Sequence, residues 1–263
     1  MTQTTEVLVP ASLDEAVSQF GDGADVTVIG GGTIVVPELS SGRLTPAKAM
    51  LLARAGLDTL ERDGDTVAVG AGVPVQRLTE LADDAQVLAE CALNVADYEV
   101  RRQGTVGGNI CATPGPDAPR GDLQGPFLAL DATARSTGAG GERSEPLEQF
   151  LSSRDGRLLL DLRFERPASS AFAALRYPHT HAYTVLAVSG VRTTSGEMRL
   201  AATGVAGGHG VRLHAAERAS EDPGAAATDG VELADDALAS AWYRERALPV
   251  LVRRVLASLE GAA

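Results

Sequence analysis

Two clusters of glycine limit most strongly what this chain can fold into. The first, in the segment VIGGGTIVV, holds Gly30, Gly31 and Gly32, and it follows an apolar run that predicts a buried strand. The second, in GTVGGNIC, has Gly107 and Gly108 at its centre. Glycine lets a ligand approach the backbone closely, and consecutive free N–H groups form a concave site for an anion. The sequence therefore predicts two backbone loops that are each suited to an anionic group.

Neither cluster matches a familiar nucleotide-binding motif. The dinucleotide fingerprint fails because no glycine stands three residues after Gly32, and the P-loop fails because no glycine run is followed by Lys-Ser or Lys-Thr. A tight turn without a ligand explains either cluster by itself. The two together, with Thr33, Thr105 and Asn109 embedded in them, favour a binding site, because these side chains add hydrogen-bonding groups.

The segment from Val100 to Leu123 is rich in glycine and proline, and it predicts irregular backbone rather than an ordinary helix or strand. It carries Asp117 and Asp122. Their carboxylates either accept hydrogen bonds from sugar or polyol hydroxyls or cap the loop.

The histidines do not predict a metal site. His179 and His181 would point to one face of a strand, but the sequence suggests no third ligand near them. There is no Gly-x-Ser-x-Gly segment and no convincing pair of nucleophile and base. The chain is therefore expected to bind a ligand, with no catalytic residue and no metal of its own.

The N-terminal part predicts strand, helix and strand in that order. The helix is expected over residues 13–20, where Ser12 and Glu15 form a capping box. The second strand leads into the first glycine cluster. Further on, Asp63 and Gly64 predict the turn of a β-hairpin.

The rest of the chain predicts mixed elements. A helix is entered through Pro74, and a longer helical stretch is broken near Asn94. A strand is expected from Pro126 onward, and two later strands are joined by a turn at Ser195–Gly196. The C-terminal helical pattern either kinks or starts a second helix at Pro249.

The charge balance excludes one class of partner. The 263 residues carry a formal net charge of -12, whereas nucleic-acid binding needs clustered Lys and Arg. Cys91 and Cys111 match no metal or redox spacing, so two free thiols in a reducing compartment are expected. The N-terminus does not resemble a signal peptide, and no apolar run approaches the roughly 18 residues of a membrane span. A cytoplasmic protein without a transmembrane segment is predicted.

The order and spacing of the glycine clusters resemble the FAD-binding medium subunit of molybdenum hydroxylases, the family of carbon monoxide dehydrogenase and xanthine dehydrogenase. That family's first loop is Ala-Gly-Gly-Thr-Asp, and this chain has Gly-Gly-Gly-Thr-Ile over 30–34. Its second loop is Arg-Asn-x-(Ala/Gly)-Thr-(Ile/Val)-Gly-Gly-Asn, which corresponds to 101–109. Gly121-Asp122 then precedes Phe-Leu-Ala-Leu-Asp-Ala, as in the family. The resemblance covers nearly the whole chain.

This resemblance implies an α+β fold. Residues 1–166 would form an α/β FAD-binding domain of the vanillyl-alcohol-oxidase or PCMH-like type, with subdomains of about 1–56 and 57–166. The short, small-residue segment after Arg166 would mark the boundary. Residues 167–263 would form a C-terminal domain of antiparallel sheet with helices.

The resemblance also implies which residues bind FAD. The first loop would hold the pyrophosphate, the second would form the opposing wall, and Asp122 would bind ribityl or ribose hydroxyls. Neutral backbone donors suit a pyrophosphate in an acidic chain. The expected cofactor-binding residues are Ile29, Gly30, Gly31, Gly32, Thr33, Ile34, Val35, Thr105, Gly107, Gly108, Asn109 and Asp122.

The implied function is an FAD-binding electron-transfer subunit of an oxidoreductase. A large molybdopterin-binding subunit and a small [2Fe-2S] subunit would be its partners, and electrons would pass from the iron–sulfur clusters to an external acceptor. One alternative is a self-contained flavin oxidoreductase of the same fold. Another is a scaffold that has lost FAD, because Ile34 replaces a polar residue and Arg176 is the nearest cation where the family often has Lys.

Overall fold

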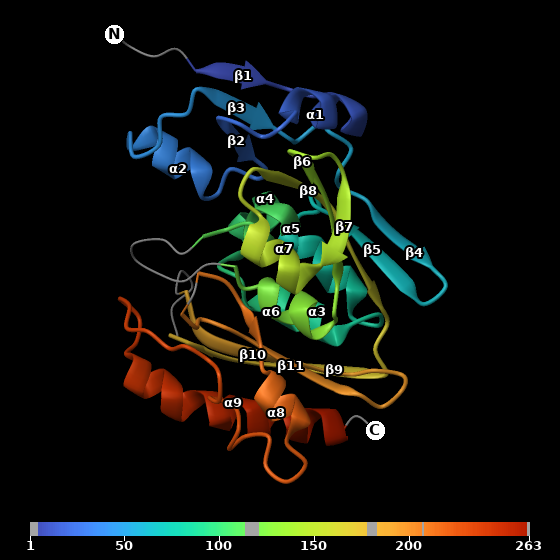
Figure 1. Cartoon of the computed structure of the whole chain (residues 1–263), viewed down its shortest axis with the longest axis vertical. Coiled ribbons are helices and arrows are strands. Elements are labelled where there is room, and N and C mark those ends of the chain that lie inside the picture. Colours follow the sequence, from blue (N-terminus) through green and yellow to red (C-terminus); the bar gives the residue numbers. More distant parts are fainter. Residues whose placement is uncertain (1–4, 114–120, 178–182, 207, 262–263) are drawn as a thin grey trace.

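Three β-sheets follow one another along the long axis of the molecule, and the two chain ends lie at opposite ends of that axis (Figure 1). The structure is a computed structural model that describes residues 5–113, 121–177, 183–206 and 208–261. Strands and helices are mixed throughout, which confirms the predicted α+β class.

The first sheet is parallel and three-stranded, in the order β1-β3-β2. It packs on the second sheet, because buried side chains of its core contact Leu158 and Leu160 from the strand β8 (Arg157–Glu165). Its elements are β1 (Glu6–Leu8), α1 (Leu13–Phe20), β2 (Val26–Ile29), α2 (Val35–Ser40) and β3 (Lys48–Leu51).

Helix α1 begins where the sequence predicts it. Ser12 caps it, because its hydroxyl accepts a hydrogen bond from the N–H of Glu15 at 3.2 Å. The reciprocal bond differs from a standard capping box, since the Glu15 carboxylate accepts from the N–H of Ala11 at 2.8 Å rather than from Ser12. Gly21 ends the helix with φ of 58°.

The second sheet is antiparallel and five-stranded, in the order β4-β5-β8-β6-β7. The hairpin turn is confirmed at Gly64, which has φ of 57°, a conformation that glycine adopts without strain. The strands are β4 (Leu60–Asp63), β5 (Thr66–Gly70), β6 (Thr133–Gly138), β7 (Arg143–Pro146) and β8 (Arg157–Glu165).

Short helices fill the space beside this sheet. The break near Asn94 is confirmed, whereas the helix after Pro74 is a 3₁₀-helix. The strand expected from Pro126 onward is wrong at its start, because its first residues belong to helix α6. All six residues of α6 are buried, so the sequence shows no alternation of polar and apolar residues with the period of a helix. The helices are η1 (Val75–Leu81), α3 (Gln86–Asn94), α4 (Tyr98–Gln103), α5 (Val106–Ile110), α6 (Gln124–Ala129) and α7 (Leu147–Ser153).

The expectation of irregular backbone over 100–123 is also wrong for its first half. The end of α4 and all of α5 lie there. Two N-caps explain these helices, because the Asp97 carboxylate accepts from the N–H of Val100 at 2.8 Å and the Thr105 hydroxyl from the N–H of Gly108 at 3.1 Å.

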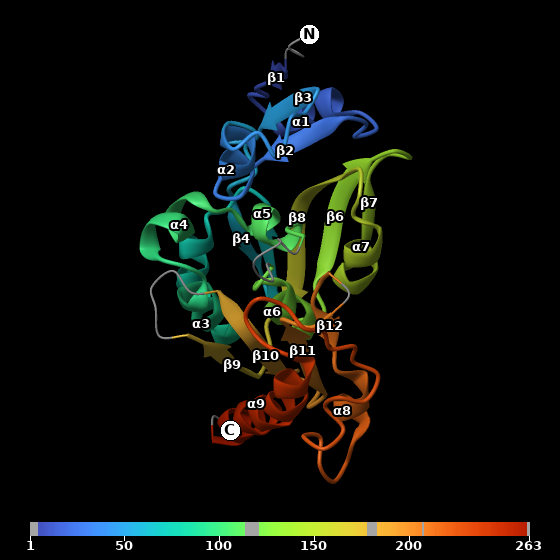
Figure 2. The ribbon, with the colours of Figure 1, turned by 90° about the vertical axis from the view of Figure 1, so that its left-hand side faces the viewer.

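The third sheet is antiparallel and four-stranded, in the order β12-β11-β10-β9. Helix α9 covers one face, and α3 and α6 cover the other (Figures 1 and 2). Of the two alternatives at Pro249, the start of a second helix is wrong: α9 continues through this residue, and Leu248, Val252 and Val255 pack onto the sheet. The elements are β9 (Ser169–Arg176), β10 (Thr184–Arg192), β11 (Met198–Thr203), β12 (Val211–Arg212), α8 (His214–Arg218) and α9 (Ala241–Gly261).

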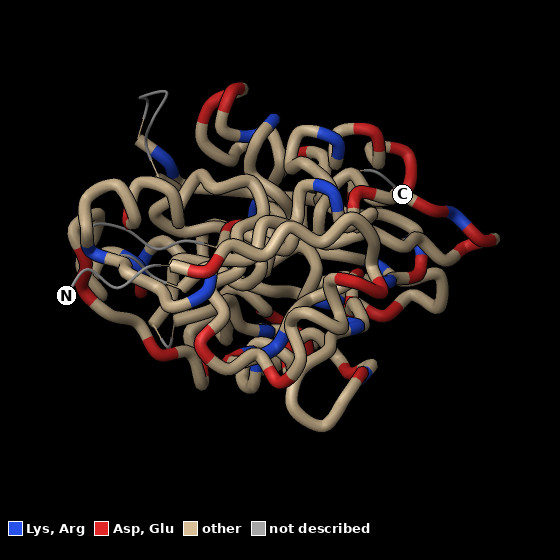
Figure 3. The backbone as a smooth tube through the Cα atoms, turned by 90° about the horizontal axis from the view of Figure 1, so that it is seen from above, with Lys and Arg blue, Asp and Glu red and all other residues tan. Residues whose placement is uncertain are grey.

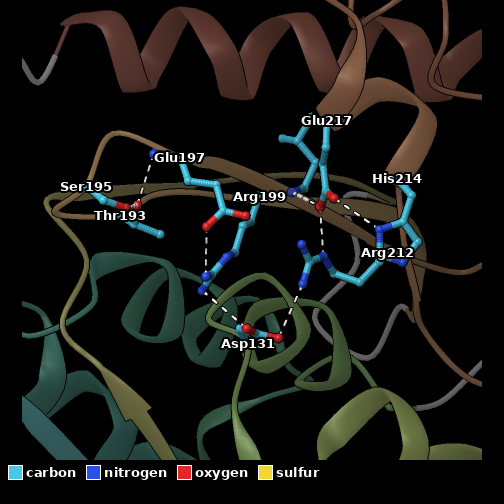
Figure 4. A network of polar contacts seen from close by, with 9 residues as sticks. Asp131, Thr193, Ser195, Glu197, Arg199, Arg212, His214 and Glu217 are labelled. Atoms are coloured by element: carbon cyan, nitrogen blue, oxygen red, sulfur yellow. Dashed lines mark hydrogen bonds and ion pairs between the residues drawn. The ribbon is translucent and has the colours of Figure 1, made fainter.

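A polar network joins the second and third sheets (Figure 4). The Asp131 carboxylate lies 3.6 Å from the guanidinium of Arg199 and 3.5 Å from that of Arg212. Glu217 accepts from Arg212 at 2.7 Å and from the N–H of Leu200 at 2.8 Å. Because Asp131 precedes β6 while both arginines lie in the third sheet, these ion pairs bridge the two parts.

Each sheet draws its strands from one of the expected units 1–56, 57–166 and 167–263. The boundaries themselves stay a prediction. Lys and Arg are interspersed with Asp and Glu over the backbone (Figure 3). None of the helices in the described ranges is long and apolar enough to cross a membrane.

Candidate cofactor-binding site

A cavity of about 510 Å³ opens where the three sheets meet. Its size falls within the roughly 300–1,000 Å³ typical of ligand sites. Ile29 does not line it. The other eleven predicted residues do: Gly30, Gly31, Gly32, Thr33, Ile34, Val35, Thr105, Gly107, Gly108, Asn109 and Asp122.

The first glycine loop presents unused donors to this cavity. Within the described ranges, no hydrogen bond takes up the N–H groups of residues 30–35. The next amide, of Val36, donates to the carbonyl of Gly32 at 3.0 Å, and this bond begins the helical hydrogen bonding of α2. Gly32 has φ of 74°, the left-handed conformation that occurs in backbone nests for anions. The loop therefore offers a row of backbone N–H donors to an anionic group.

The second glycine loop differs from the prediction, because its amides are already used. The N–H of Gly107 donates to the carbonyl of Ala71 at 2.8 Å, and that of Gly108 donates to the Thr105 hydroxyl. The N–H of Asn109 donates to the carbonyl of Thr105 at 2.9 Å. The expected wall of free backbone donors is thus wrong. These N–H groups already donate to backbone carbonyls of the protein and to the Thr105 hydroxyl that caps helix α5.

The glycines of both loops serve close packing. A Cβ on Gly31 would collide with the carbonyl of Gln103, and one on Gly30 would strike the Thr105 hydroxyl. A Cβ on Gly107 would lie 2.8 Å from that of Ala71. The two loops therefore touch each other directly, backbone against backbone, along one side of the cavity.

Asp122 contributes the acidic group of the cavity wall. Its side chain is half-buried, and burial raises the pKa of this carboxyl above its ordinary value. Hydrogen bonds from Thr184 and Asn109, together with the charge of Arg176, act in the opposite direction on the pKa. A half-buried carboxylate on a cavity wall can accept hydrogen bonds from ligand hydroxyls.

Sequence reasoning missed the apolar walls. These side chains come from strand ends and connections that the sequence marks only as hydrophobic, which is also the mark of ordinary core. They are Val28, Leu52, Leu57, Val75, Leu158 and Leu159. Such walls suit flat ring systems, which bury large apolar faces.

Arg157 also lines the cavity without offering it a free charge. Its guanidinium donates to the hydroxyl of Ser136 at 3.2 Å and to the carbonyl of Ala139 at 3.1 Å. Burial lowers the pKa of this group. Because its donors point into the sheet, the neutral amides of the first loop are better placed than Arg157 to hold an anion.

Cys111, one of the two free thiols, lines the cavity as well. Burial raises the pKa of its thiol to about 11. The thiol therefore stays protonated at neutral pH, and it is a poor nucleophile. Both cysteines are free, as the sequence predicts.

A tight turn at Ala96 forms another part of the wall. Ala96 has φ of 40°, an unusual value for a residue with a side chain. Two guanidinium groups hold this turn: Arg101 donates to the carbonyl of Ala96 at 3.1 Å, and Arg176 donates to the same carbonyl at 3.2 Å. Arg176, whose role the sequence left open, thus braces the cavity wall.

Some candidates fall outside the described residues: Asp117, His179 and His181. Within the described ranges, no group of three or more His, Cys, Asp or Glu side chains could hold a metal ion.

The cavity combines free backbone amides, apolar walls and a carboxylate, which is the set of groups that a large ligand with an anionic part and hydroxyls needs. The comparisons with known proteins agree. Residues 3–163 match the family described as "FAD binding domain in molybdopterin dehydrogenase". Because this match covers more than half of the chain, the protein belongs to that family.

Individual relatives support the assignment. The 6-hydroxypseudooxynicotine dehydrogenase complex subunit alpha of Paenarthrobacter nicotinovorans is 27% identical, over 96% of this chain and 93% of the relative. The carbon monoxide dehydrogenase medium chain of Hydrogenophaga pseudoflava is 30% identical, over 56% of this chain and 51% of the relative. In the reconstituted CO dehydrogenase from Oligotropha carboxidovorans, one chain superposes with a TM-score of 0.87 at 23% identity, with all of both chains covered. This last likeness is one of fold.

Family membership confirms the resemblance found in the sequence. It confirms an FAD-binding domain of the molybdopterin dehydrogenase family, and the two relatives are named as parts of dehydrogenases.

Proposed function

We propose that this chain is the electron-transfer subunit of a molybdenum-containing dehydrogenase and that its cavity holds FAD. The main observation behind this proposal is the run of backbone amides over 30–35 that have no hydrogen-bond acceptor among the described residues and lie on the wall of a cavity of about 510 Å³. A diphosphate is the part of FAD that would accept from these groups, because consecutive backbone N–H groups complement it without any cation.

The other residues of the cavity have distinct roles in this proposal. Asp122 would accept hydrogen bonds from hydroxyls of the cofactor, since its carboxylate faces the cavity and is partly desolvated. Thr33 would add a hydroxyl beside the amides. Leu158 and Leu159 would exclude water from ring faces. Cys111, protonated at neutral pH, would not react with the cofactor.

When bound, FAD supplies the ability to accept electrons from one-electron carriers and to release them in pairs to an acceptor. The chain itself cannot hold an iron–sulfur cluster of the usual kind, because it has two cysteines and such clusters need four thiolates. The molybdopterin and [2Fe-2S] groups would therefore lie on partner subunits, in keeping with relatives that are named as parts of larger enzymes. A cytoplasmic location stays a prediction.

The first test is FAD binding by the purified chain. We expect the visible absorption of oxidised flavin after reconstitution and gel filtration, with one FAD for each chain. A chain that shows no flavin absorption even with excess FAD would contradict the proposal and favour a scaffold that has lost the cofactor. Substrate turnover by the isolated, FAD-loaded chain would instead favour a self-contained flavin enzyme.

A further inference from the structure

The turn after helix α3 lies on the wall of the cavity and lacks the glycine that ends many helices. Helix α3 stops at Asn94, and α4 begins at Tyr98. Between them, Ala96 has φ of 40° and lines the cavity together with Val95 and Asp97. Glycine adopts such a left-handed conformation without strain, whereas the Cβ of alanine disfavours it. The turn therefore needs support from neighbouring groups.

Two arginines give this support by binding the last carbonyls of the helix and of the turn, which have no partner within α3. Arg101, from α4, donates to the carbonyl of Val95 at 3.0 Å and to that of Ala96 at 3.1 Å. Arg176, from β9, donates to the carbonyl of Asn94 at 2.7 Å and to that of Ala96 at 3.2 Å. The carbonyl of Ala96 thus accepts from both guanidinium groups, so the turn is held from two sides.

These two arginines come from different parts of the fold. Arg101 is anchored within the second part, because its Nε donates to the side-chain oxygen of Gln76 in η1 at 3.0 Å. Arg176 belongs to the third sheet, where it pairs with Thr184 across the β9–β10 ladder. Neither arginine lines the cavity, whereas Ala96 does. The turn, and not the arginines, therefore makes the direct contact with a ligand in the cavity.

We propose that Arg101 and Arg176 are positioning residues that hold Ala96 in its left-handed conformation and so keep the cavity wall in the shape that binds FAD. The inference rests on the proposed binding of FAD. It makes cofactor affinity depend on the third sheet, through one guanidinium that bridges two backbone carbonyls. The shape of Arg176 then matters as well as its charge, because the ammonium of lysine lacks the planar fork of arginine.

The experiment measures the FAD affinity of the full chain by absorption titration and the thermal unfolding of the apo protein. We expect Arg176→Gln to weaken FAD binding about tenfold, which is the size of one lost hydrogen bond from a charged group. Arg176→Lys keeps the charge and should weaken binding nearly as much, and it carries the test if Arg176→Gln does not fold. Wild-type affinity in either folded variant would overturn the proposal.

Ala96→Gly tests whether Arg176 acts through the turn. Glycine adopts the left-handed conformation without help, so a chain with this substitution should depend less on the arginine. In the Ala96→Gly background we expect Arg176→Gln to weaken FAD binding only about threefold, against about tenfold in the wild-type background. An equal loss in the two backgrounds would show that Arg176 does not act through Ala96, and it would overturn the proposal.

Arg199→Gln is the matched control (Figure 4). Arg199 also joins the third sheet to the second, but its partners are Asp131 and Glu197 rather than the turn, and it does not line the cavity. This variant should leave FAD affinity unchanged. A loss as large as that of Arg176→Gln would mean that any weakened contact between the two sheets disturbs the cavity, and it would overturn the specific role of the turn. Failure of the wild-type chain to bind FAD would instead overturn the proposed function.

Discussion

The two glycine loops look alike in sequence, but in the structure they differ in the hydrogen bonding of their backbone amides. In the first loop, the amides of 30–35 have no acceptor among the described residues. In the second, the amides of 106–109 donate to carbonyls and to a hydroxyl of the protein itself. The first loop thus has backbone amides free to bind an anion, whereas the amides of the second loop are used within the fold, against which the first loop packs.

The difference shows that glycine content alone does not identify a binding loop. The amides of Val106 and Gly107 are consumed because the carbonyls of Val73 and Ala71 lie beside them. The amide of Gly108 is consumed because Thr105 caps α5. Whether a glycine-rich loop binds an anion therefore depends on which acceptors the rest of the fold brings to it.

The largest expected effect is that of Gly31→Ala. Its Cβ would collide with the backbone of Gln103 and Gly104, so the first loop would have to move away from the second. We expect the apo protein to lose about 1–3 kcal/mol of stability, as is usual for overpacking. FAD affinity should fall more than about a hundredfold, equivalent to roughly 2.7 kcal/mol. Thermal unfolding and absorption titration measure the two effects separately.

Gly107→Ala is the comparison for that variant. The new Cβ would also come too close to a neighbour, the Cβ of Ala71, but Ala71 is not part of the first glycine loop. It should reduce stability by a similar amount and FAD affinity much less. Equal losses of affinity in the two variants would show that the loops do not differ in function.

The next effect concerns Asp122→Asn. Because burial raises the pKa of Asp122, the folded state holds the proton more tightly than the unfolded chain does. This group favours folding in acid, and that contribution is lost as pH rises through the folded pKa. At neutral pH, the apo variant should therefore be more stable than wild type, with a higher Tm. The advantage should shrink toward about pH 4, near the ordinary pKa of Asp.

The same variant should bind FAD about tenfold more weakly at neutral pH, because an amide replaces an ionised acceptor. Stability and affinity then change in opposite directions, as expected for a residue kept for function. Thermal unfolding and FAD titration at two pH values suffice. A variant less stable than wild type at neutral pH would show that Asp122 stabilises the fold instead.

Local sequence signals predicted local features well. The cap of α1 at Ser12, the turn at Gly64 and the break near Asn94 each depend on neighbouring residues, and all three are confirmed. Helix α6 was missed because it is buried on every side, which removes the polar face that reveals a helix.

The sequence predicted which residues line the cavity better than it predicted which of their N–H groups are free. The set of residues implied by the family resemblance lies, all but Ile29, around one cavity. The sequence could not show that the amide of Gly107 is taken by Ala71, because that contact is made only when β5 and α5 meet in the fold. The hydrogen bond from the Asn94 side chain to the Thr184 hydroxyl could not be predicted from the sequence for the same reason.

Thr105→Val should have a smaller effect and sharpens the contrast between the loops. It removes the cap of α5 while it keeps the shape of the side chain, and it frees the amide of Gly108. Loss of an N-cap reduces stability by about 1 kcal/mol. If the second loop is only a wall, FAD affinity should fall about fivefold as that wall loosens, and Thr105→Ser should restore it. An increase in affinity would mean that the freed amide binds the cofactor.

The smallest effect is expected for Gly108→Ala. Its N–H is already bonded to Thr105, and its Cβ would meet only that hydroxyl, at 3.0 Å. Alanine favours a helix over glycine by up to about 1 kcal/mol, which offsets the tight contact. We therefore expect nearly unchanged stability and less than about a threefold change in FAD affinity, measured by the same titration. A loss above about tenfold would mean that the cofactor lies directly against Gly108, and that the second loop binds it as well as the first does.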